Sequence, residues 1–335
     1  MTEKDSTTQK VENMYKKYPY PSPSTDISQT NELLNLLRIF EIESKIKLKK
    51  KNILDAGSGS GHRITNVAGF FEDCNFLGID ISENSLKIAN KLKSIKKIKN
   101  IQFQKHNIMT GVENLGKFEI VLCMGVLHHL SNPTKGLQML SKTLEDDGII
   151  FLYLYGKLGG HKRMINKETL SLLLGNEKSN YDLGIKLVRE LKLNKFDYGW
   201  NLNFKNKEEE DALIVDSLLH ANEFLYDCKE IDELFSESNL YGYSIFGITT
   251  GTEGLLFDSS ITTDKKLSIP QTDISKKLKS KFVLPFYEAL NLKDKLRIID
   301  LVYEPNGYTI IGFTKTAFEK LSNEINKILT DKNYQ

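Results

Sequence analysis

The stretch Asn52-Ile-Leu-Asp-Ala-Gly-Ser-Gly-Ser-Gly-His62 decides the fold of this chain of 335 residues. It begins with the apolar pattern of a short buried strand and passes through three closely spaced glycines into a helical pattern. Glycine allows a tight turn and lets a ligand approach the main chain without interference from a Cβ atom. The stretch therefore predicts a strand, a ligand-binding loop and a helix in succession.

Strand and helix patterns alternate on the C-terminal side of this loop. Parallel strands need helix-sized crossover connections, so the alternation predicts an α/β fold with a mostly parallel sheet covered by helices on both faces. The expected strands cover residues 52–56, 75–80, 101–105, 118–123, 148–154, 241–248 and 308–314. The expected helices cover residues 62–72, 83–97, 133–144 and 229–239, with further helical regions at 157–227 and 274–302.

The composition is that of an ordinary globular protein. Hydrophobic residues make up 40% and charged residues 27%, which excludes wholesale disorder. The longest apolar run, residues 149–155, is far shorter than the roughly 20 residues of a membrane-spanning helix, and the polar start of the chain has no apolar signal core. We expect no membrane span and no export, and the cytoplasm as the location.

The use of cysteine and arginine limits the kinds of partner that this chain is expected to bind. The cysteines Cys74, Cys123 and Cys228 are far apart and form no CxxC or Cys/His cluster, so we expect neither disulfides nor a metal site. The net charge is +2, but only five of the 46 basic residues are arginine, the side chain that phosphate readers favour. The lysines between Asn84 and Val112 alternate with apolar residues, as on the polar face of an amphipathic helix. A nucleic acid is therefore not favoured as a partner.

The glycine spacing separates this loop from two common phosphate-binding loops. A dinucleotide fingerprint, G-x-G-x-x-G, would place its last Gly or Ala at the position of His62, whereas the third glycine is Gly61. A P-loop ends in Lys followed by Ser or Thr, and no such pair follows this loop. The spacing counts against a nicotinamide dinucleotide and against phosphoryl transfer.

An acidic residue, Asp80, ends the second expected strand about 20 positions after the loop. A carboxylate at this place can accept hydrogen bonds from both ribose hydroxyls of an adenosine-bearing cofactor. The alternative is a helix N-cap or a surface carboxylate.

Together, Asp55-x-Gly57-x-Gly59-x-Gly61, Asp80 and the string Phe118-Glu-Ile-Val-Leu-Cys-Met-Gly-Val-Leu-His-His-Leu-Ser-Asn-Pro133 resemble the class I S-adenosylmethionine-dependent methyltransferases. The likeness covers residues 50–155 and, more weakly, residues 229–248. It implies S-adenosyl-L-methionine as the cofactor. It also implies a Rossmann-like sheet of seven strands, mostly parallel, whose last strand, 308–314, is antiparallel.

The resemblance assigns contacts to the cofactor. The three loop glycines would line the methionine moiety, Asp80 would hold the ribose and Ile81 would pack on the adenine. An asparagine stands where the family usually has an aspartate before an apolar residue, and its amide oxygen can accept the same hydrogen bond from the adenine amine. The implied cofactor-binding residues are Asp55, Gly57, Ser58, Gly59, Gly61, Asp80, Ile81, Asn107, Ile108, Cys123 and Met124.

A smaller group of poorly characterised microbial methyltransferases is also similar, at Tyr18-Pro-Tyr-Pro21 and from Asp216 to Phe235. This similarity extends over most of the chain but supplies no substrate. On this reading the chain has four parts. They are an N-terminal arm with a capping helix (1–50), a cofactor-binding core (51–156), a helical insertion that caps the substrate (157–228) and a C-terminal completion of the sheet with a helical insertion of its own (229–335).

Methyl transfer needs a nucleophile held in line behind the methyl group, and a base only when that nucleophile must lose a proton. His128 and His129 follow the fourth strand, at the end where open α/β sheets bind ligands. The segment Leu127 to Asn132 is similar to the Leu-His-Asp-Trp-Ser-Asp string of small-molecule O-methyltransferases, which implies a base at His128. For both histidines the alternative is a structural role that shapes the pocket.

Two further segments carry candidates for substrate contact. Tyr15, Tyr18 and Tyr20 lie in or before a proline-stiffened arm, which can close a pocket at low entropic cost, and simple packing on the sheet is the alternative. His161 and Arg163 follow the fifth strand and are candidates to face the substrate, with a solvated loop as the alternative.

The sequence thus predicts a methyltransferase that acts on an unidentified acceptor, with a small molecule favoured. An RNA or a protein acceptor is the first alternative. From other classes, a non-catalytic S-adenosylmethionine-binding regulatory module stays open, and an oxidoreductase is disfavoured by the glycine spacing. The oligomeric state stays open as well.

Overall fold

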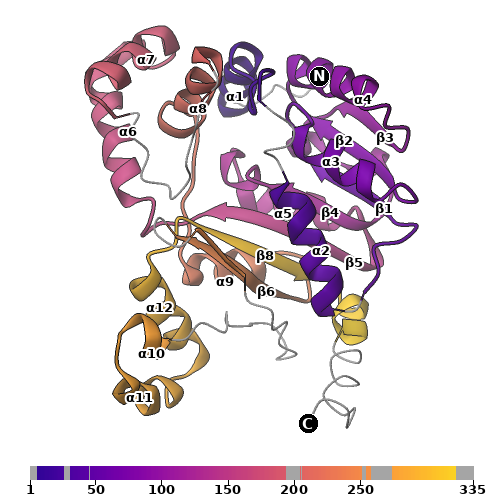
Figure 1. Ribbon diagram of the computed structural model, residues 1–335, viewed down its shortest axis with the longest axis vertical. Helices are drawn as coiled ribbons and strands as arrows, with labels where there is room; N and C mark the ends of the chain where they lie inside the picture. The colour runs from indigo at the N-terminus through magenta and orange to yellow at the C-terminus, as the bar shows by residue number, and fades with distance from the viewer. Residues whose placement is uncertain are drawn as a thin grey trace.

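The computed structural model describes residues 6–25, 31–44, 46–193, 204, 206–250, 254–257 and 274–321. Within them a sheet of eight strands runs in the order β3-β2-β1-β4-β5-β8-β6-β7 (Figure 1). Neighbours among β1 to β5 pair in parallel, β8 is antiparallel to β5 and β6, and β7 is antiparallel to β6 at the edge. The strands are β1 (Asn52–Ala56), β2 (Asn75–Asp80), β3 (Ile101–Lys105), β4 (Phe118–Met124), β5 (Leu144–Tyr155), β6 (Gly242–Thr250), β7 (Gly254–Phe257) and β8 (Gly307–Phe313).

The sheet confirms the predicted Rossmann-like fold, with its seven expected strands and an antiparallel last strand. Two details differ. The short edge strand β7 is an eighth strand that the pattern does not predict. Strand β5 begins four residues before its expected start because the acidic run 145–147 hides the strand pattern, and the pairing of β4 with β5 is irregular there.

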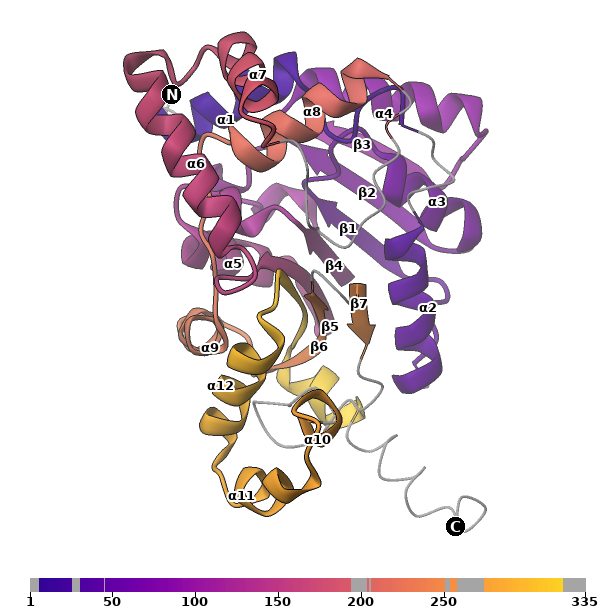
Figure 2. The same cartoon turned by 60° about the vertical axis from the view of Figure 1, so that its left-hand side comes forward.

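Helices cover both faces of the sheet, as Figures 1 and 2 show from two directions. The helices on and beside the sheet are α2 (Glu32–Ser44), α3 (His62–Phe70), α4 (Glu83–Ile95), α5 (Pro133–Ser141), α9 (Cys228–Ser236), α10 (Ile274–Lys277), α11 (Leu284–Glu288) and α12 (Leu292–Tyr303). The remaining helices, above the carboxyl ends of the strands, are α1 (Ser6–Lys17), α6 (His161–Leu174), α7 (Tyr181–Glu190) and α8 (Lys207–Leu218).

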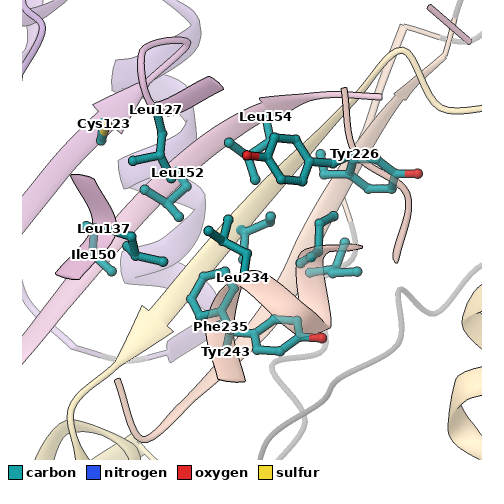
Figure 3. Close-up of a cluster of buried hydrophobic side chains, with 14 of the residues drawn as sticks. Cys123, Leu127, Leu137, Ile150, Leu152, Leu154, Tyr226, Leu234, Phe235 and Tyr243 are labelled. Carbon is teal, nitrogen blue, oxygen red and sulfur yellow. The ribbon is translucent and has the colours of Figure 1, made fainter. Parts of the chain in front are cut away.

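The strand residues alternate between two hydrophobic cores. In β5, Ile149 and Phe151 face the core beneath α2 and α3, while Ile150 and Leu152 face the core beneath α5 and α9. Figure 3 shows part of this second core. Successive side chains of a strand point to opposite faces, so a sheet buried on both sides needs apolar residues at nearly every position.

Helix α1 is an element that the sequence does not predict. Met14 of α1 is fully buried in a third cluster, which also contains Leu170 of α6, Val188 of α7 and Val215 of α8. Figure 2 shows α1 beside α7 and α8. The helix has few apolar residues of its own, so its pattern is weak, and its burial depends on packing against helices far away in the sequence. None of the helices in the described part of the chain combines the length and the apolar character needed to cross a bilayer.

Candidate active site

The glycine loop joins the end of β1 to the start of α3. The main-chain N–H groups of Gly57 and Ser58 both donate to the carbonyl of Ile79, at 2.8 and 2.9 Å, and so fasten the loop to β2. Gly57, Gly59 and Gly61 all have positive φ values, 91°, 54° and 77°, in the region that favours glycine. The loop conformation therefore explains the three glycines before any ligand is considered.

The surroundings of two of these glycines differ. A Cβ atom on Gly59 would lie 2.7 Å from the carbonyl oxygen of Tyr20, because the N-terminal arm crosses the loop there. A Cβ atom on Gly61 would lie 2.7 Å from the side chain of Ala89, because α3 packs closely on α4. Gly59 is thus needed for the contact of loop and arm, and Gly61 for helix packing.

A half-buried carboxylate, Asp80, and a buried one, Asp55, flank the loop. Asp80 accepts hydrogen bonds from the N–H groups of Gly59 (2.9 Å) and Ser82 (2.8 Å), and burial nevertheless raises the pKa of its carboxyl. Asp55, at the end of β1, is 6% exposed, and burial raises its pKa to about 7. Both raised pKa values follow from loss of water around a negative charge.

A cavity of about 420 Å³ lies over the carboxyl ends of β1, β2 and β4 and beneath α1 and α8. Open α/β sheets place their ligands at this end of the strands. The sequence-predicted residues that line the cavity are Tyr15, Tyr20, Asp55, Gly57, Ser58, Gly59, Asp80, Ile81, Asn107, Ile108, Met124, His129 and Arg163.

Five predicted residues do not line this cavity, namely Gly61, Cys123, His128, His161 and Tyr18. Gly61 lies in the helix contact described above, and Cys123 points into the core beneath α5 (Figure 3). His128 is fully buried behind the cavity wall, with its ring centroid 4.0 Å from that of Tyr155. His161 is an exposed residue at the start of α6. The short 3₁₀ turn that holds both histidines thus separates them, with His129 at the cavity and His128 behind it.

The N-terminal arm closes one side of the cavity. The Ser60 hydroxyl donates to the carbonyl of Pro21 at 2.8 Å, which holds the arm on the glycine loop. Tyr20 lines the cavity, whereas the Tyr18 hydroxyl donates outside it to the exposed Asp182 at 2.7 Å. Of the three arm tyrosines, Tyr15 and Tyr20 therefore face the cavity.

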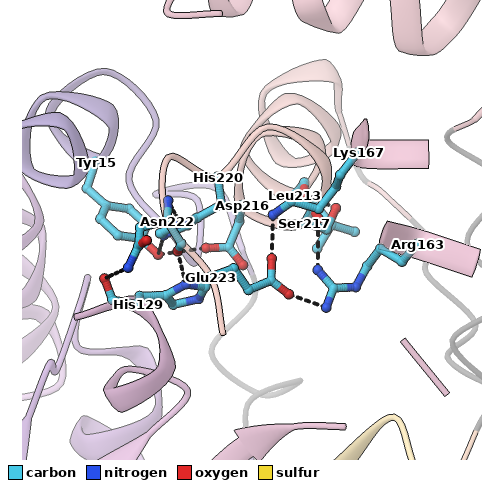
Figure 4. A network of polar contacts seen from close by, with 10 residues as sticks. All are labelled: Tyr15, His129, Arg163, Lys167, Leu213, Asp216, Ser217, His220, Asn222 and Glu223. Carbon is cyan, nitrogen blue, oxygen red and sulfur yellow. Dashed lines mark hydrogen bonds and ion pairs between the residues drawn. The ribbon is translucent and has the colours of Figure 1, made fainter. Parts of the chain in front are cut away.

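A polar network that the sequence does not predict forms the other end of the cavity (Figure 4). Arg163 and Lys167 of α6 both form ion pairs with the buried Glu223, and the Arg163 guanidinium lies 4.9 Å from the ring centroid of Tyr155. The ring of His129 stacks on that of His220 at a centroid distance of 3.6 Å. This end of the cavity is rich in hydrogen-bonding groups.

Helix α8 contributes most of the residues that sequence reasoning misses at this end. Leu213, Asp216 and Ser217 of α8 line the cavity, together with Tyr153 and Tyr155 at the end of β5. The similarity over residues 216–235 marks the segment that contains Asp216, but no pattern indicates which of its side chains face a cavity. Among the described residues, no cluster of three or more His, Cys, Asp or Glu side chains could hold a metal ion.

The fold and the site together define a class. The mostly parallel sheet with an antiparallel β8, the glycine loop after β1 and the acidic residue at the end of β2 agree with what the resemblance to the Rossmann-like, S-adenosylmethionine-dependent methyltransferases implies. Residues 47–198 match a family model described as a methyltransferase domain. This match, over a little under half of the chain, identifies residues 47–198 as a methyltransferase domain.

Several known proteins are similar to this chain. An uncharacterized protein of Synechococcus is 27% identical over 250 residues, which cover 70% of this chain and 59% of that protein. A ubiquinone biosynthesis O-methyltransferase of Dechloromonas aromatica is 29% identical over 131 residues, which cover 39% of this chain and 55% of that enzyme. The structure of PKMT2 from Rickettsia typhi in complex with AdoHcy has a similar fold, with a TM-score of 0.55 at 19% identity, over 83% of this chain and 52% of that one. The chain thus matches between half and three fifths of the length of these relatives.

Proposed function

We propose that this chain binds S-adenosylmethionine in the cavity and transfers its methyl group to an acceptor, for which we favour a small molecule. The observation that carries the proposal is the main chain of the glycine loop, which lines the cavity between the buried Asp55 and the half-buried Asp80. Within this loop the Ser58 hydroxyl is buried and has no hydrogen-bond partner among the described residues, so it can bond to a ligand.

The lining residues fit the parts of the cofactor. Asp80 would accept from the ribose hydroxyls, Ile81 and Ile108 would contact the adenine, and Asn107 would accept from its amine. Asp55, Met124 and the loop residues 57–59 would surround the methionine end. Gly61 and Cys123 would act only through packing. When bound, S-adenosylmethionine supplies an electrophilic methyl group, and the arm over the glycine loop would exclude water from it.

We place the acceptor at the polar end of the cavity, next to Tyr15, His129 and Arg163, beneath the insertion that we propose as its cap. His129 reaches this space and His128 does not. Burial lowers the pKa of His129 to about 4, which makes it a weak base near neutral pH, so we assign it contact with the acceptor. The relative that is an O-methyltransferase of ubiquinone biosynthesis supports a small acceptor. The cysteines of the chain are buried free thiols, which supports the cytoplasm as the location.

Calorimetric titration with S-adenosylhomocysteine tests the cofactor site. Asp80→Ala removes the proposed contact with two hydroxyls and should weaken binding by tens-fold or more, since a hydrogen bond to a charged group contributes about 1.5 to 3 kcal/mol. The matched control is Asp146→Ala, which changes an exposed aspartate of β5 and should leave the affinity unchanged. Unchanged affinity of the Asp80 variant, or no binding by the unaltered protein, would contradict the proposal.

A labelled-methyl screen then tests the acceptor. Cell extract is separated into small-molecule, RNA and protein fractions, and each is incubated with the protein and methyl-labelled S-adenosylmethionine. We expect label in the small-molecule fraction. Label in the RNA or protein fraction would reassign the acceptor, and binding without transfer to any fraction would favour a regulatory module.

A further inference from the structure

A chain of hydrogen bonds ends on a carboxylate in the polar end of the cavity. Asp216 of α8 is 5% exposed and lines the cavity. Its Oδ1 accepts a hydrogen bond of 2.8 Å from the hydroxyl of Tyr15, which comes from α1, 201 positions earlier in the sequence (Figure 4). The same Tyr15 oxygen lies 3.2 Å from Nε2 of His220.

The hydrogen bond from Asn222 to His220 determines which atom donates in each of the other bonds of this network. The main-chain N–H of Asn222 donates to Nδ1 of His220 at 3.1 Å, so Nδ1 carries no proton. Burial holds the pKa of His220 well below its ordinary value, so the ring is neutral and its one proton is on Nε2. Nε2 therefore donates to the Tyr15 oxygen, and the Tyr15 hydroxyl proton must point to Asp216.

One carboxylate oxygen of Asp216 remains available to accept a hydrogen bond from a ligand in the cavity. Oδ1 is occupied by Tyr15, whereas Oδ2 accepts no hydrogen bond from the residues that the structure describes. The two arginines that line the cavity have other partners, since Arg163 pairs with Glu223 and Arg63 pairs with Glu32 at 3.0 Å. Asp216 itself forms no ion pair in the described ranges. It is a buried carboxylate that a hydrogen-bond donor in the cavity would satisfy.

We propose that Asp216 accepts the proton of the methyl acceptor, whose reacting atom is then a nitrogen or an oxygen that bears hydrogen. This inference rests on the proposed function. The acceptor atom forms a bond to the methyl carbon as the carbon–sulfur bond breaks, and the electron pair of the broken bond stays on sulfur. The acceptor proton passes to Oδ2 of Asp216 and from there to solvent. Tyr15 is a positioning residue, which orients the carboxylate.

The electrostatics of Asp216 suit this role. Burial raises its pKa to about 6, and the hydrogen bond from Tyr15 acts in the opposite direction. A base is most effective when its pKa lies near the working pH, which favours Asp216 over His129. In addition, His129 already has a hydrogen-bond partner, since its Nδ1 lies 2.8 Å from the carbonyl oxygen of Asn222. The titratable and charged groups around Asp216 are Tyr15 of α1, Tyr20 of the arm, Arg63 of α3, Tyr155 of β5, Lys167 of α6, and His220 and Glu223 after α8.

The first test is the pH profile of single-turnover methyl transfer to the fraction that takes up label. The unaltered protein should lose rate as the pH falls below about 6, because Asp216 becomes protonated. Asp216→Asn should lower the rate about 10²-fold or more and abolish this acid limb. Tyr15→Phe should move the acid limb to higher pH, since it removes a bond that lowers the pKa of Asp216.

Infrared difference spectroscopy of the free protein provides a second readout, independent of turnover. The spectrum of the unaltered protein minus that of Asp216→Asn should contain a protonated-carboxyl band that titrates near pH 6. In Tyr15→Phe this band should titrate at higher pH. Circular dichroism and melting curves check that both variants are folded.

The chain contains a matched control pair outside the cavity, Tyr18 and Asp182, which form the same tyrosine-to-carboxylate bond at 2.7 Å. Tyr18→Phe and Asp182→Asn should leave the pH profile unchanged. An acid limb that persists in Asp216→Asn, or the absence of a carboxyl band near pH 6, would overturn the inference. Loss of S-adenosylhomocysteine binding in Asp216→Asn would reassign this residue to the cofactor, whereas failure of the unaltered protein to bind it would overturn the proposed function itself.

Discussion

The carboxyl group of Asp55, in the proposed binding site, lowers the free energy of unfolding of the protein as the pH rises. Its carboxyl has a pKa of about 7 in the folded chain, against an ordinary value of 3.8. The folded state therefore binds this proton more tightly than the unfolded state does. As the pH rises from about 4 to 7, the unfolded state loses the proton first, and folding becomes less favourable.

Asp55→Asn removes this penalty. We expect the variant to melt at a higher temperature than the unaltered protein, by about 1 to 2 °C for each kcal/mol recovered in a chain of this length. The difference should be small near pH 4, grow up to about pH 7 and stay constant above it. Differential scanning calorimetry of the free protein across this range checks the prediction. Asp146→Asn, at an exposed position, is the control, and an equal difference at every pH would contradict the explanation.

Sequence predicts some site residues better than others. Asp80 could be predicted because it ends a strand next to the glycine loop, and both lie on short segments with strong patterns. The separation of His128 from His129 could not, because a 3₁₀ turn, which has no recognisable pattern here, decides which ring faces the cavity. Asp216 could not be predicted either, since its place depends on contact with Tyr15 of a distant helix.

At the scale of elements, α1 depends on one fully buried apolar side chain. Met14 is fully buried against α6, α7 and α8, and α1 has few other apolar contacts of this kind. Met14→Ala should weaken the docking of α1 by about 2 to 5 kcal/mol, the usual range for a buried Met→Ala change. Limited proteolysis should then cut residues 6–25 faster while the sheet stays resistant.

The control for this prediction lies on the same helix. Lys10→Ala changes an exposed residue of α1 and should leave the cleavage rate unchanged. If both variants are cut at the rate of the unaltered protein, Met14 does not hold the helix. Because α1 carries Tyr15, faster cleavage of the Met14 variant should be accompanied by weaker acceptor binding.

At the scale of the whole molecule, Asp300 joins three elements. This fully buried carboxylate accepts from the N–H of Cys228 at the start of α9 (3.0 Å), from the Cys228 thiol (3.0 Å) and from the Tyr308 hydroxyl of β8 (2.6 Å), and it lies on α12 itself. Asp300→Ala leaves the donors without their partner, at about 1 to 3 kcal/mol for each buried group. We expect a single, lowered unfolding midpoint in urea.

The comparison variant is Asp294→Ala, which changes an exposed aspartate in the first turn of the same helix. Its midpoint should fall by much less, since an exposed contact of this kind contributes about 1 kcal/mol or less. Equal effects of the two changes would show that the buried cluster has no special part in stability.

Some features of the global fold could be predicted from the sequence, and others could not. Alternating patterns locate the strands of the parallel half, where buried segments are apolar on both faces. The order of strands in the sheet is not contained in such patterns. The resemblance carried by the glycine loop and Asp80 implied an antiparallel last strand, but the place of this strand between β5 and β6 was not predicted. Strand β7 escaped prediction because its four residues lie in a stretch rich in glycine, threonine and serine.

The position of β8 between β5 and β6 has a consequence for synthesis on the ribosome. Residues 307–313 emerge more than 50 positions after the end of β6, so β5 and β6 have no neighbour on their shared side until then. Open strand edges attract other chains, which makes the nascent polypeptide prone to aggregate during this interval. The glycine loop is translated early, but the scaffold that supports it closes only when the last strand is inserted.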